Sequence, residues 1–279
     1  MAGYVYYNGV FDKRERITIP LSDRSFFFGD GIYDMAIGCG GKIYQADMHI
    51  DRFMMNADRL GIKHEYTHDE IMDLLLRTVG RSGYDEYTVY FQLSRTKAQR
   101  IHSAKGTSCA LMIAIDPYEI TAPKDEVKLI SHEDKRYYYC NIKTVNLLPS
   151  VIASTAAEEA GCDEALLHRN GTVTECAHSN FFIIKDGTLI GHPDGELILP
   201  GITGINLVKE ARRLGIPVVR RPFTLAEVYS CDEALITSTT KFARRVCSLD
   251  GIAVGGKDYD RVSALCKSLY GDFCKKMEK

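Results

Sequence analysis

The chain has 279 residues, which fits one large domain or two small ones and is enough to bury a substantial hydrophobic core. Hydrophobic residues make up 45% of it and charged residues 26%, so disordered, collagen-like and disulfide-scaffold classes are excluded. With 35 basic and 37 acidic side chains, the formal net charge is −2. This balance gives no basic excess for binding nucleic acid or an anionic membrane surface.

The sequence favours a cytoplasmic protein. It has no run of 18 apolar residues that could span a bilayer, and residues 1–5 lack the basic and apolar regions of a secretion signal. Its nine cysteines are an odd number without a C-x-x-C pair, which favours reduced thiols over a disulfide framework or a zinc site. We therefore expect no membrane contact, no nucleic-acid partner and no metal.

The N-terminal part predicts strands and two helices. Asn8-Gly9 accepts the positive φ of a tight turn between two short strands. Apolar residues then recur at helical spacing from Asp47, the expected N-cap, to Gly61, the expected stop. Thr67-x-x-Glu70 is a capping box that begins a second helix. In chain order we expect a hairpin at 4–11, helices at 47–61 and 67–79, and strands at 87–94 and 109–115.

Two prolines and clustered charge at 116–125 indicate a linker, so we expect domains at 1–118 and 119–279. Beyond the linker, Asn170-Gly171 predicts a second hairpin turn and Thr224-x-x-Glu227 another capping box. Strands and helices alternate, which favours an α/β fold. The expected strands are 126–131, 165–167, 173–175, 181–184 and 234–236, and the expected helices are 151–160, 205–214 and 262–277.

Lys143 stands in an apolar run, 140–148, directly after three tyrosines. Loss of hydration in apolar surroundings lowers the pKa of a lysine, and its amine can then form a Schiff base. A lysine on a half-buried strand more often points to water, so this run alone leaves both interpretations open.

Three further segments carry polar groups. Glu175 precedes small polar residues up to Asn180, and it could hold a proton on a ring nitrogen or simply end a solvated strand. The glycine turn 199–204 precedes a helix, and 237–240 is a hydroxyl cluster after a buried strand. Helix N-terminal amides and hydroxyls suit a phosphate, although each segment could also be a capped helix or a polar turn. Neither is a Walker loop or a dinucleotide fingerprint.

Together these motifs resemble the class IV aminotransferases, fold-type IV enzymes dependent on pyridoxal phosphate, and among them the D-amino acid aminotransferases. The resemblance extends from Tyr6 to Thr240. It implies a mixed α/β, two-domain architecture with the cofactor in the cleft between domains, and a homodimer. The motifs are Y-Y-N-G at 6–9, G-D-G-I-Y at 29–33, H-x-x-R-F at 49–53, I-K-x-x-N-L-L at 142–148, T-E-x-x-x-S-N at 174–180, P-G-I-T at 200–203 and S-T at 238–239.

The resemblance also implies roles for single residues. Lys143, in the C-terminal domain, would carry pyridoxal 5'-phosphate and act as the general base, and Glu175 would pair with the ring nitrogen. The other implied cofactor-binding residues are Arg52, Ser179, Ile202, Thr203, Ser238 and Thr239. The implied substrate-binding residues are Tyr33, Tyr90, Arg100 and His102. Of these, Arg100 and His102 would bind the substrate α-carboxylate from the neighbouring subunit.

The implied reaction transfers the amino group of a D-amino acid such as D-alanine to a 2-oxo acid such as 2-oxoglutarate, giving D-glutamate and pyruvate. One alternative is an L-branched-chain or (R)-amine transaminase, which we would favour if Arg100 and His102 point away from the site. Another is a 4-amino-4-deoxychorismate lyase, which would release pyruvate without any amino acceptor.

Overall fold

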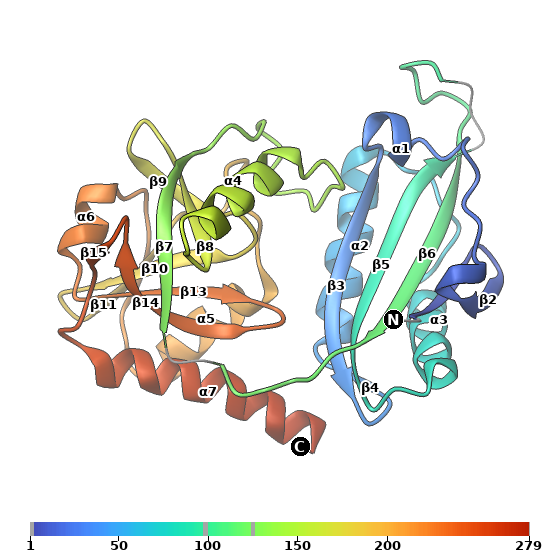
Figure 1. The fold of residues 1–279 in the computed structure, drawn as a ribbon. Coiled ribbons are helices and arrows are strands. Elements are labelled where there is room, and N and C mark those ends of the chain that lie inside the picture. Colours follow the sequence, from blue (N-terminus) through green and yellow to red (C-terminus); the bar gives the residue numbers. More distant parts are fainter. Residues whose placement is uncertain (1–2, 97–99, 124–125, 279) are drawn as a thin grey trace. The chain divides into compact units, whose positions relative to one another are not determined.

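The computed structural model describes residues 3–96, 100–123 and 126–278 (Figure 1). Its contacts divide the chain into two compact units, and each combines a sheet with helices, so the expected mixed α/β class is confirmed. The first unit comprises Met1–Thr121, Ile142–Asn146 and Lys276–Glu278, and the second comprises Ala122–Asn141 and Leu147–Lys275.

The first unit is built on a six-stranded antiparallel sheet with the strand order β2-β1-β6-β5-β3-β4. The predicted Asn8-Gly9 turn joins the first two strands, with φ angles of 46° and 102°. The strands are β1 (Tyr4–Tyr7), β2 (Val10–Lys13), β3 (Gly31–Cys39), β4 (Lys42–Ile43), β5 (Glu86–Thr96) and β6 (Ser108–Pro117). The helices are α1 (Ser25–Phe28), α2 (Ala46–Leu60) and α3 (His68–Ser82), with a 3₁₀ turn at Arg14–Arg16.

Helices α2 and α3 pack on this sheet and bury its core (Figure 1). Ile50, Phe53 and Ala57 follow the predicted helical spacing on α2, and the ring centre of Phe53 lies 4.8 Å from that of Phe91 on β5. The burial of this apolar stripe fixes α2 against the sheet.

The start of α2 differs from the prediction. Its N-cap is Gln45, which has a φ of 58°, instead of Asp47. The chain therefore turns into the helix earlier than expected, and Asp47 lies in the first turn, where its charge suits the helix dipole. The capping box of Thr67 and Glu70 begins α3 as predicted.

The second unit has a nine-stranded mixed sheet with the order β12-β11-β10-β13-β14-β7-β8-β9, and β15 pairs with β14. The β11–β12, β14–β7 and β7–β8 pairs are parallel. The strands are β7 (Glu126–Glu133), β8 (Glu164–Arg169), β9 (Thr172–Cys176), β10 (Asn180–Lys185), β11 (Thr188–Gly191), β12 (Val218–Arg220), β13 (Glu233–Ser238), β14 (Phe242–Leu249) and β15 (Ile252–Ala253). The helices are α4 (Leu148–Glu159), α5 (Ile202–Arg213), α6 (Leu225–Ser230) and α7 (Tyr259–Met277).

Alternate residues of the central strands of this sheet enter two separate cores. On one face, Leu235 of β13 packs with Leu207 of α5 and Leu265 of α7. On the other, Ile236 packs with Val228 of α6. Burial on both faces explains why β10 and β13 read as continuous apolar runs in the sequence.

The segment that carries Lys143 differs from expectation in its place in the fold. By its contacts, Ile142–Asn146 belongs to the first unit, although it follows the predicted boundary, and it has an irregular backbone. The physical reason is that Ile142 is buried in the first unit's core and Thr144 forms a β-bridge with Ile32. The domain boundary at residue 118 stays a prediction, and linker residues 124–125 lie outside the described residues.

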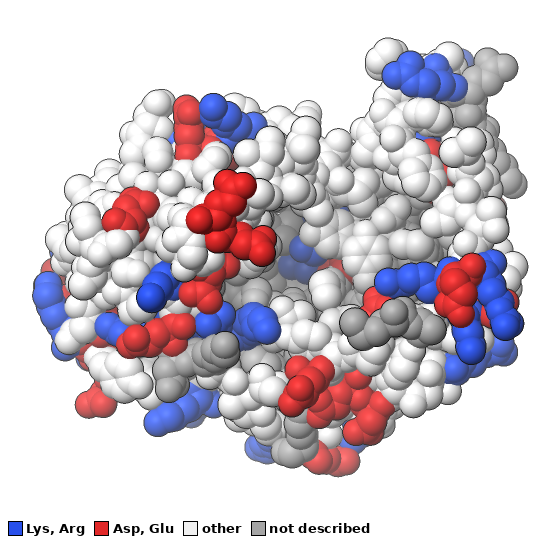
Figure 2. All heavy atoms as spheres, in the orientation of Figure 1, with Lys and Arg blue, Asp and Glu red and all other residues white. Residues whose placement is uncertain are grey.

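Acidic and basic side chains are interspersed over the surface that Figure 2 shows. All nine cysteines are free thiols. Among the helices that the structure describes, none has the length and apolar character needed to cross a bilayer. The cytoplasmic location stays a prediction.

Candidate functional site

Lys143 is fixed to the sheet of the first unit through the backbone. Its carbonyl accepts a hydrogen bond from the Tyr33 N–H at 2.9 Å, and the Asn146 side chain donates to the Gly29 carbonyl at 2.6 Å. The amine Nζ lies 4.4 Å from the ring centre of Tyr33. This contact holds the ammonium group over an aromatic face and gives the lysine a defined position.

Two predicted substrate residues lie on neighbouring strands, and one of them, Tyr33, contacts this lysine. Tyr33 of β3 and Tyr90 of β5 stack with 5.3 Å between ring centres. The Tyr90 hydroxyl donates to Gln92 Oε1 at 2.7 Å, and burial raises the pKa of Tyr90 above its usual value. Lys143 thus contacts Tyr33, which stacks on Tyr90, and the substrate-binding roles of the two tyrosines stay predictions.

Arg52 of α2 lies outside the apolar stripe but is buried, because its guanidinium pairs with the Asp34 carboxylate. Its Nε donates to Asp34 Oδ2 at 2.8 Å and its Nη2 to Oδ1 at 2.7 Å. His49, one turn earlier on the same face of the helix, places Nδ1 2.8 Å from Asp34 Oδ1. The charge of Lys143 acts on the pKa of His49, so this cluster lies within electrostatic reach of the lysine. We call these three residues the Asp34 cluster.

The Asp34 cluster contains charges of both signs. Burial alone would raise the pKa of Asp34, but the charge of Arg52 and the hydrogen bond with His49 outweigh it and hold the pKa well below its usual range. Burial lowers the pKa of His49 against its contact with Asp34, and the positive charges of Arg52 and Lys143 lower it further. Near neutral pH, Asp34 is therefore ionised and His49 neutral. Sequence reasoning missed both residues, although His49 is the first letter of the H-x-x-R-F motif.

In the second unit, Glu175 is buried on β9 and accepts hydrogen bonds from three segments. Arg136 Nη1 lies 2.5 Å from Oε1, Asn180 Nδ2 lies 2.9 Å from Oε2, and the Leu199 N–H lies 3.1 Å from both oxygens. Burial raises the pKa of Glu175 to about 7, against the lowering effects of Arg136 and the Leu199 N–H. Glu175 is therefore a buried, titratable carboxylate and not a solvated strand end.

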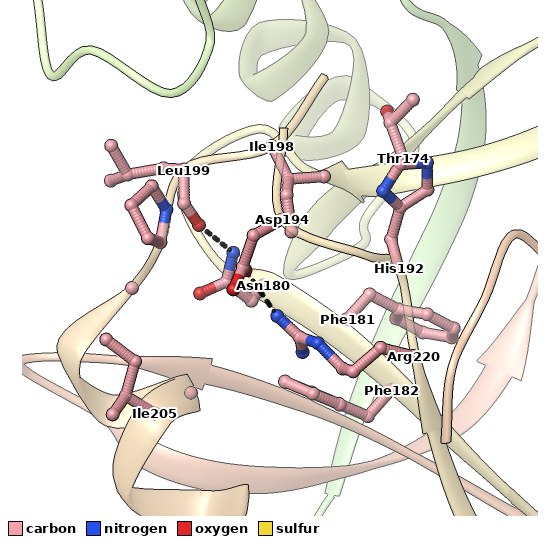
Figure 3. Close-up of a pocket in the computed structure, with 13 residues that line it drawn as sticks. Thr174, Asn180, Phe181, Phe182, His192, Asp194, Ile198, Leu199, Ile205 and Arg220 are labelled. Carbon is pink, nitrogen blue, oxygen red and sulfur yellow. Dashed lines mark hydrogen bonds and ion pairs between the residues drawn. The ribbon is translucent and has the colours of Figure 1, made fainter. Parts of the chain in front are cut away.

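The glycine turn before α5 packs against Glu175 through Asn180. The Asn180 amide also donates to the Leu199 carbonyl at 2.8 Å (Figure 3). A Cβ on Gly201 would lie 1.9 Å from Asn180 Oδ1, so only glycine allows this approach. Gly201 is the N-cap of α5, and the helix begins at Ile202, three residues earlier than predicted.

Helix α5 therefore begins with Ile202 and Thr203, two residues that the sequence predicts to bind the cofactor. Ile202 and Thr203 lie in its first turn, where backbone N–H groups and the positive end of the helix dipole suit an anion. Ser238 ends β13 and Thr239 follows in the turn to β14. The buried Thr237 hydroxyl before them has no hydrogen-bond partner among the described residues.

A small pocket lies beside the same turn (Figure 3). Asn180, Leu199 and Gly201 form one part of its lining, and His192 and Arg220 form another. Asn180, which lines this pocket, is also the residue that contacts both Glu175 and the glycine turn.

Ser179 and the pair Arg100 and His102 have other contacts. Ser179 is buried and its hydroxyl donates to Glu164 Oε2 at 2.8 Å. Arg100 and His102 lie exposed between β5 and β6, where the Arg100 guanidinium carbon is 5.5 Å from the Phe28 ring centre of α1. The cofactor role of Ser179 and the substrate roles of Arg100 and His102 stay predictions.

The sequence also contains a metal-binding motif that the sequence analysis missed, H-E-x-x-H at residues 64–68. In zinc enzymes both histidines of this motif lie on one helix face. Here Thr67 is the N-cap of α3, so His64 precedes the helix and His68 begins it. Within the described ranges, no group of three or more His, Cys, Asp or Glu side chains is arranged to hold a metal ion.

The family model for class IV amino-transferases matches residues 31–249, which include Lys143, Glu175 and the start of α5. The chain belongs to the class IV aminotransferase family. A D-alanine aminotransferase of Listeria monocytogenes serotype 4b is 33% identical over 256 residues, which are 90% of this chain and 89% of that protein.

Solved structures share the fold of this class IV chain. A branched-chain aminotransferase from Thermoproteus uzoniensis with norvaline superposes with a TM-score of 0.89 over 100% of this chain and 98% of that one, at 22% identity. A putative 4-amino-4-deoxychorismate lyase from Legionella pneumophila gives a TM-score of 0.85 over 93% and 97%, at 27% identity. The fold therefore occurs in structures whose names describe different reactions.

The Asp34 cluster predicts a specific loss of stability in the variant Asp34→Asn. We expect the free energy of unfolding to fall by roughly 3–5 kcal/mol at pH 7, because the variant leaves the buried charge of Arg52 without its counter-ion. The pKa of Asp34 is lowered in the folded chain, so its contribution is present above its ordinary value of 3.8 and is lost as the pH falls below it. Urea unfolding from pH 7 to pH 3 should show the difference shrinking.

The matched control is Asp51→Asn, an exposed acidic residue on the same helix. It should change the free energy of unfolding by no more than about 0.5 kcal/mol. Equal effects of the two variants at pH 7 would contradict the assigned role of Asp34.

Proposed function

We propose that this chain is a pyridoxal-phosphate-dependent aminotransferase that moves the amino group of a D-amino acid such as D-alanine to a 2-oxo acid such as 2-oxoglutarate, forming pyruvate and D-glutamate. The observation that carries the proposal is the 33% identity with a D-alanine aminotransferase over 90% of this chain, together with the family match. The positions of Lys143 and Glu175 support it, because they supply the two groups that such chemistry needs.

The residues present fit pyridoxal phosphate. Lys143 offers an amine in a defined position, and Glu175 is a buried carboxylate that can accept a ring N–H. The anion-binding groups are a guanidinium, amides at a helix start and two hydroxyls, which is the donor set that a phosphate requires. In this proposal Arg52, Ile202, Thr203, Ser238 and Thr239 hold the phosphate. Ser179, whose hydroxyl donates to Glu164, is a further cofactor-binding residue.

When bound, pyridoxal phosphate supplies an aldehyde for the amino group and a ring that accepts the electrons left when the substrate Cα loses its proton. The chain's own residues perform the remaining work. Nζ of Lys143 would be the general base that removes the substrate Cα proton. Glu175 holds a proton at the ring nitrogen. The bidentate contact of Asp34 fixes the Arg52 guanidinium, so that its orientation does not depend on the ligand.

We also propose that Arg100 and His102 bind the substrate carboxylate in a homodimer. Both residues are exposed, and the Arg24 guanidinium fixes their segment by donating to the carbonyls of Ile101 and His102 at 2.6 and 3.1 Å. A guanidinium fork suits a carboxylate. Exposed side chains on a backbone that is held in place are what a site completed by a second subunit needs.

The runner-up functions are an L-branched-chain or (R)-amine transaminase and a 4-amino-4-deoxychorismate lyase. Their support is the shared fold with the Thermoproteus uzoniensis enzyme and the 27% identity with the Legionella pneumophila protein. The Listeria monocytogenes relative is closer in sequence, which favours the D-amino acid. Substrate stereochemistry and the need for an amino acceptor separate the three.

The proposed function is tested by the visible absorption spectrum of the protein loaded with pyridoxal 5'-phosphate. We expect a yellow band that bleaches with D-alanine and persists with L-alanine or L-leucine. Lys143→Ala should lose turnover while keeping its fold by circular dichroism, because the base and the covalent attachment are both removed. Bleaching by L-leucine alone would support the branched-chain alternative. Release of pyruvate without an amino acceptor would support the lyase. If no band appears, the cofactor assignment is refuted.

Substrate binding is tested separately with Arg100→Ala. Loss of one charge-assisted contact to the carboxylate should raise KM for D-alanine by roughly 10–100-fold, while affinity for pyridoxal 5'-phosphate stays within about twofold. Lys105→Ala removes an exposed positive charge from the same connection and is the control. If both variants keep the wild-type KM, Arg100 has no role in carboxylate binding.

A further inference from the structure

The closest partner of the Glu175 carboxylate is a residue that no sequence motif indicates. Arg136 follows β7 and donates through Nη1 to Glu175 Oε1 at 2.5 Å, whereas the other donors, Asn180 and the Leu199 N–H, are neutral. Arg136 thus supplies the positive charge in direct contact with a carboxylate that is buried inside the second unit.

Arg136 is itself held by a second acidic residue. Its Nε and Nη2 both donate to the buried Asp134 carboxylate at 2.9 Å, and Nη2 also reaches the Leu197 carbonyl at 3.2 Å. Arg169 Nε lies 3.3 Å from Asp134 Oδ2, and its Nη2 donates to the Arg136 carbonyl at 2.7 Å. The guanidinium therefore has no freedom to turn away from Glu175.

The charges around Glu175 balance. Arg136 and Asp134 face it directly, and Arg169 lies behind Asp134. Two thiols also face it: burial raises the pKa of Cys140 to about 11 and raises that of Cys176, so both are neutral near pH 7. Two acidic and two basic groups then sum to zero when Glu175 is ionised, and removal of Arg136 takes away the positive charge that contacts Glu175 directly.

We propose that Arg136 is a positioning residue that keeps Glu175 ionised and thereby holds the proton on the ring nitrogen of the bound cofactor. A single proton is shared between the carboxylate and the ring nitrogen, and it resides on the group with the higher proton affinity. Burial raises the proton affinity of the carboxylate and the guanidinium opposes it. Without Arg136 the proton moves to Glu175, the ring nitrogen becomes neutral, and the ring accepts electrons less well.

This inference rests on the proposed function, and its test separates the two. The holoenzymes are prepared with pyridoxal 5'-phosphate labelled with ¹⁵N in the ring, and the ¹⁵N chemical shift is measured at pH 7.5. The wild type should give the shift of a protonated ring nitrogen and Arg136→Gln that of a neutral one. Arg136→Lys, which keeps the charge, should stay protonated. Arg169→Gln, which removes a guanidinium that contacts Asp134 but not Glu175, should also stay protonated.

The turnover rates of the same variants give a second readout. In Arg136→Gln, kcat should fall by more than about tenfold with KM changed by less than about threefold, since one pKa unit alters the ratio of ionised to neutral carboxyl tenfold. A protonated ring nitrogen in Arg136→Gln would overturn the inference. A neutral ring nitrogen in Arg169→Gln would also overturn it, because loss of the proton would then follow from any disruption of the charges and not from the loss of Arg136. A wild type that binds no label would refute the proposed function instead.

If Arg136→Gln does not fold, Arg136→His replaces it, because its charge can be switched in the folded protein. The ring nitrogen should lose its proton as the pH is raised through the titration of the imidazole, and the wild type should keep it over the same range. An unchanged shift across that range would overturn the role of Arg136.

Discussion

The buried Glu175 carboxylate is the interaction on which the arrangement of the second unit's candidate site depends. Its two oxygens collect donors from the segment after β7, from β10 and from the turn before α5. Because a buried carboxylate is costly unless its lone pairs are satisfied, these three segments are constrained to meet at one point. The position of the first turn of α5 therefore follows from the hydrogen bonds of a residue on β9.

The first unit also contains a buried carboxylate paired with an arginine, but there the pKa of the carboxyl is lowered instead of raised. Asp34 also anchors a buried arginine, but it receives two hydrogen bonds from that arginine and one contact from His49. These contacts outweigh burial, so Asp34 stays ionised over the whole neutral range. Glu175 shares its arginine with Asp134, and burial prevails, which brings its pKa to about 7. Asp34 is thus suited to hold a charge in place, whereas Glu175 is suited to share a proton.

The sequence predicted what short-range patterns determine. The Asn8-Gly9 and Asn170-Gly171 turns and the capping box at Thr67 encode local geometry, and each is confirmed. The Lys143 segment was misplaced because its membership of the first unit depends on long-range contacts of Ile142 and Thr144 that no local pattern reports.

The candidate site follows the same division. Motifs indicated Lys143, Tyr33 and Arg52, and the structure brings the first two into contact. They did not indicate Asp34 or Arg136, since the partner of a buried charge is defined only when distant strands and helices pack together. The roles of these residues in binding and catalysis stay predictions.

The most direct test of this account is the pKa of Glu175 in the cofactor-free protein. The side-chain carboxyl ¹³C chemical shift can be followed by NMR from pH 4 to pH 9, with its resonance assigned by its loss in Glu175→Gln. A midpoint near 7 is predicted, because burial exceeds the stabilisation of the carboxylate by Arg136. A midpoint near the ordinary value of 4.5 would contradict the account, since Arg136 and the other donors would then cancel the effect of burial and leave Glu175 no raised proton affinity.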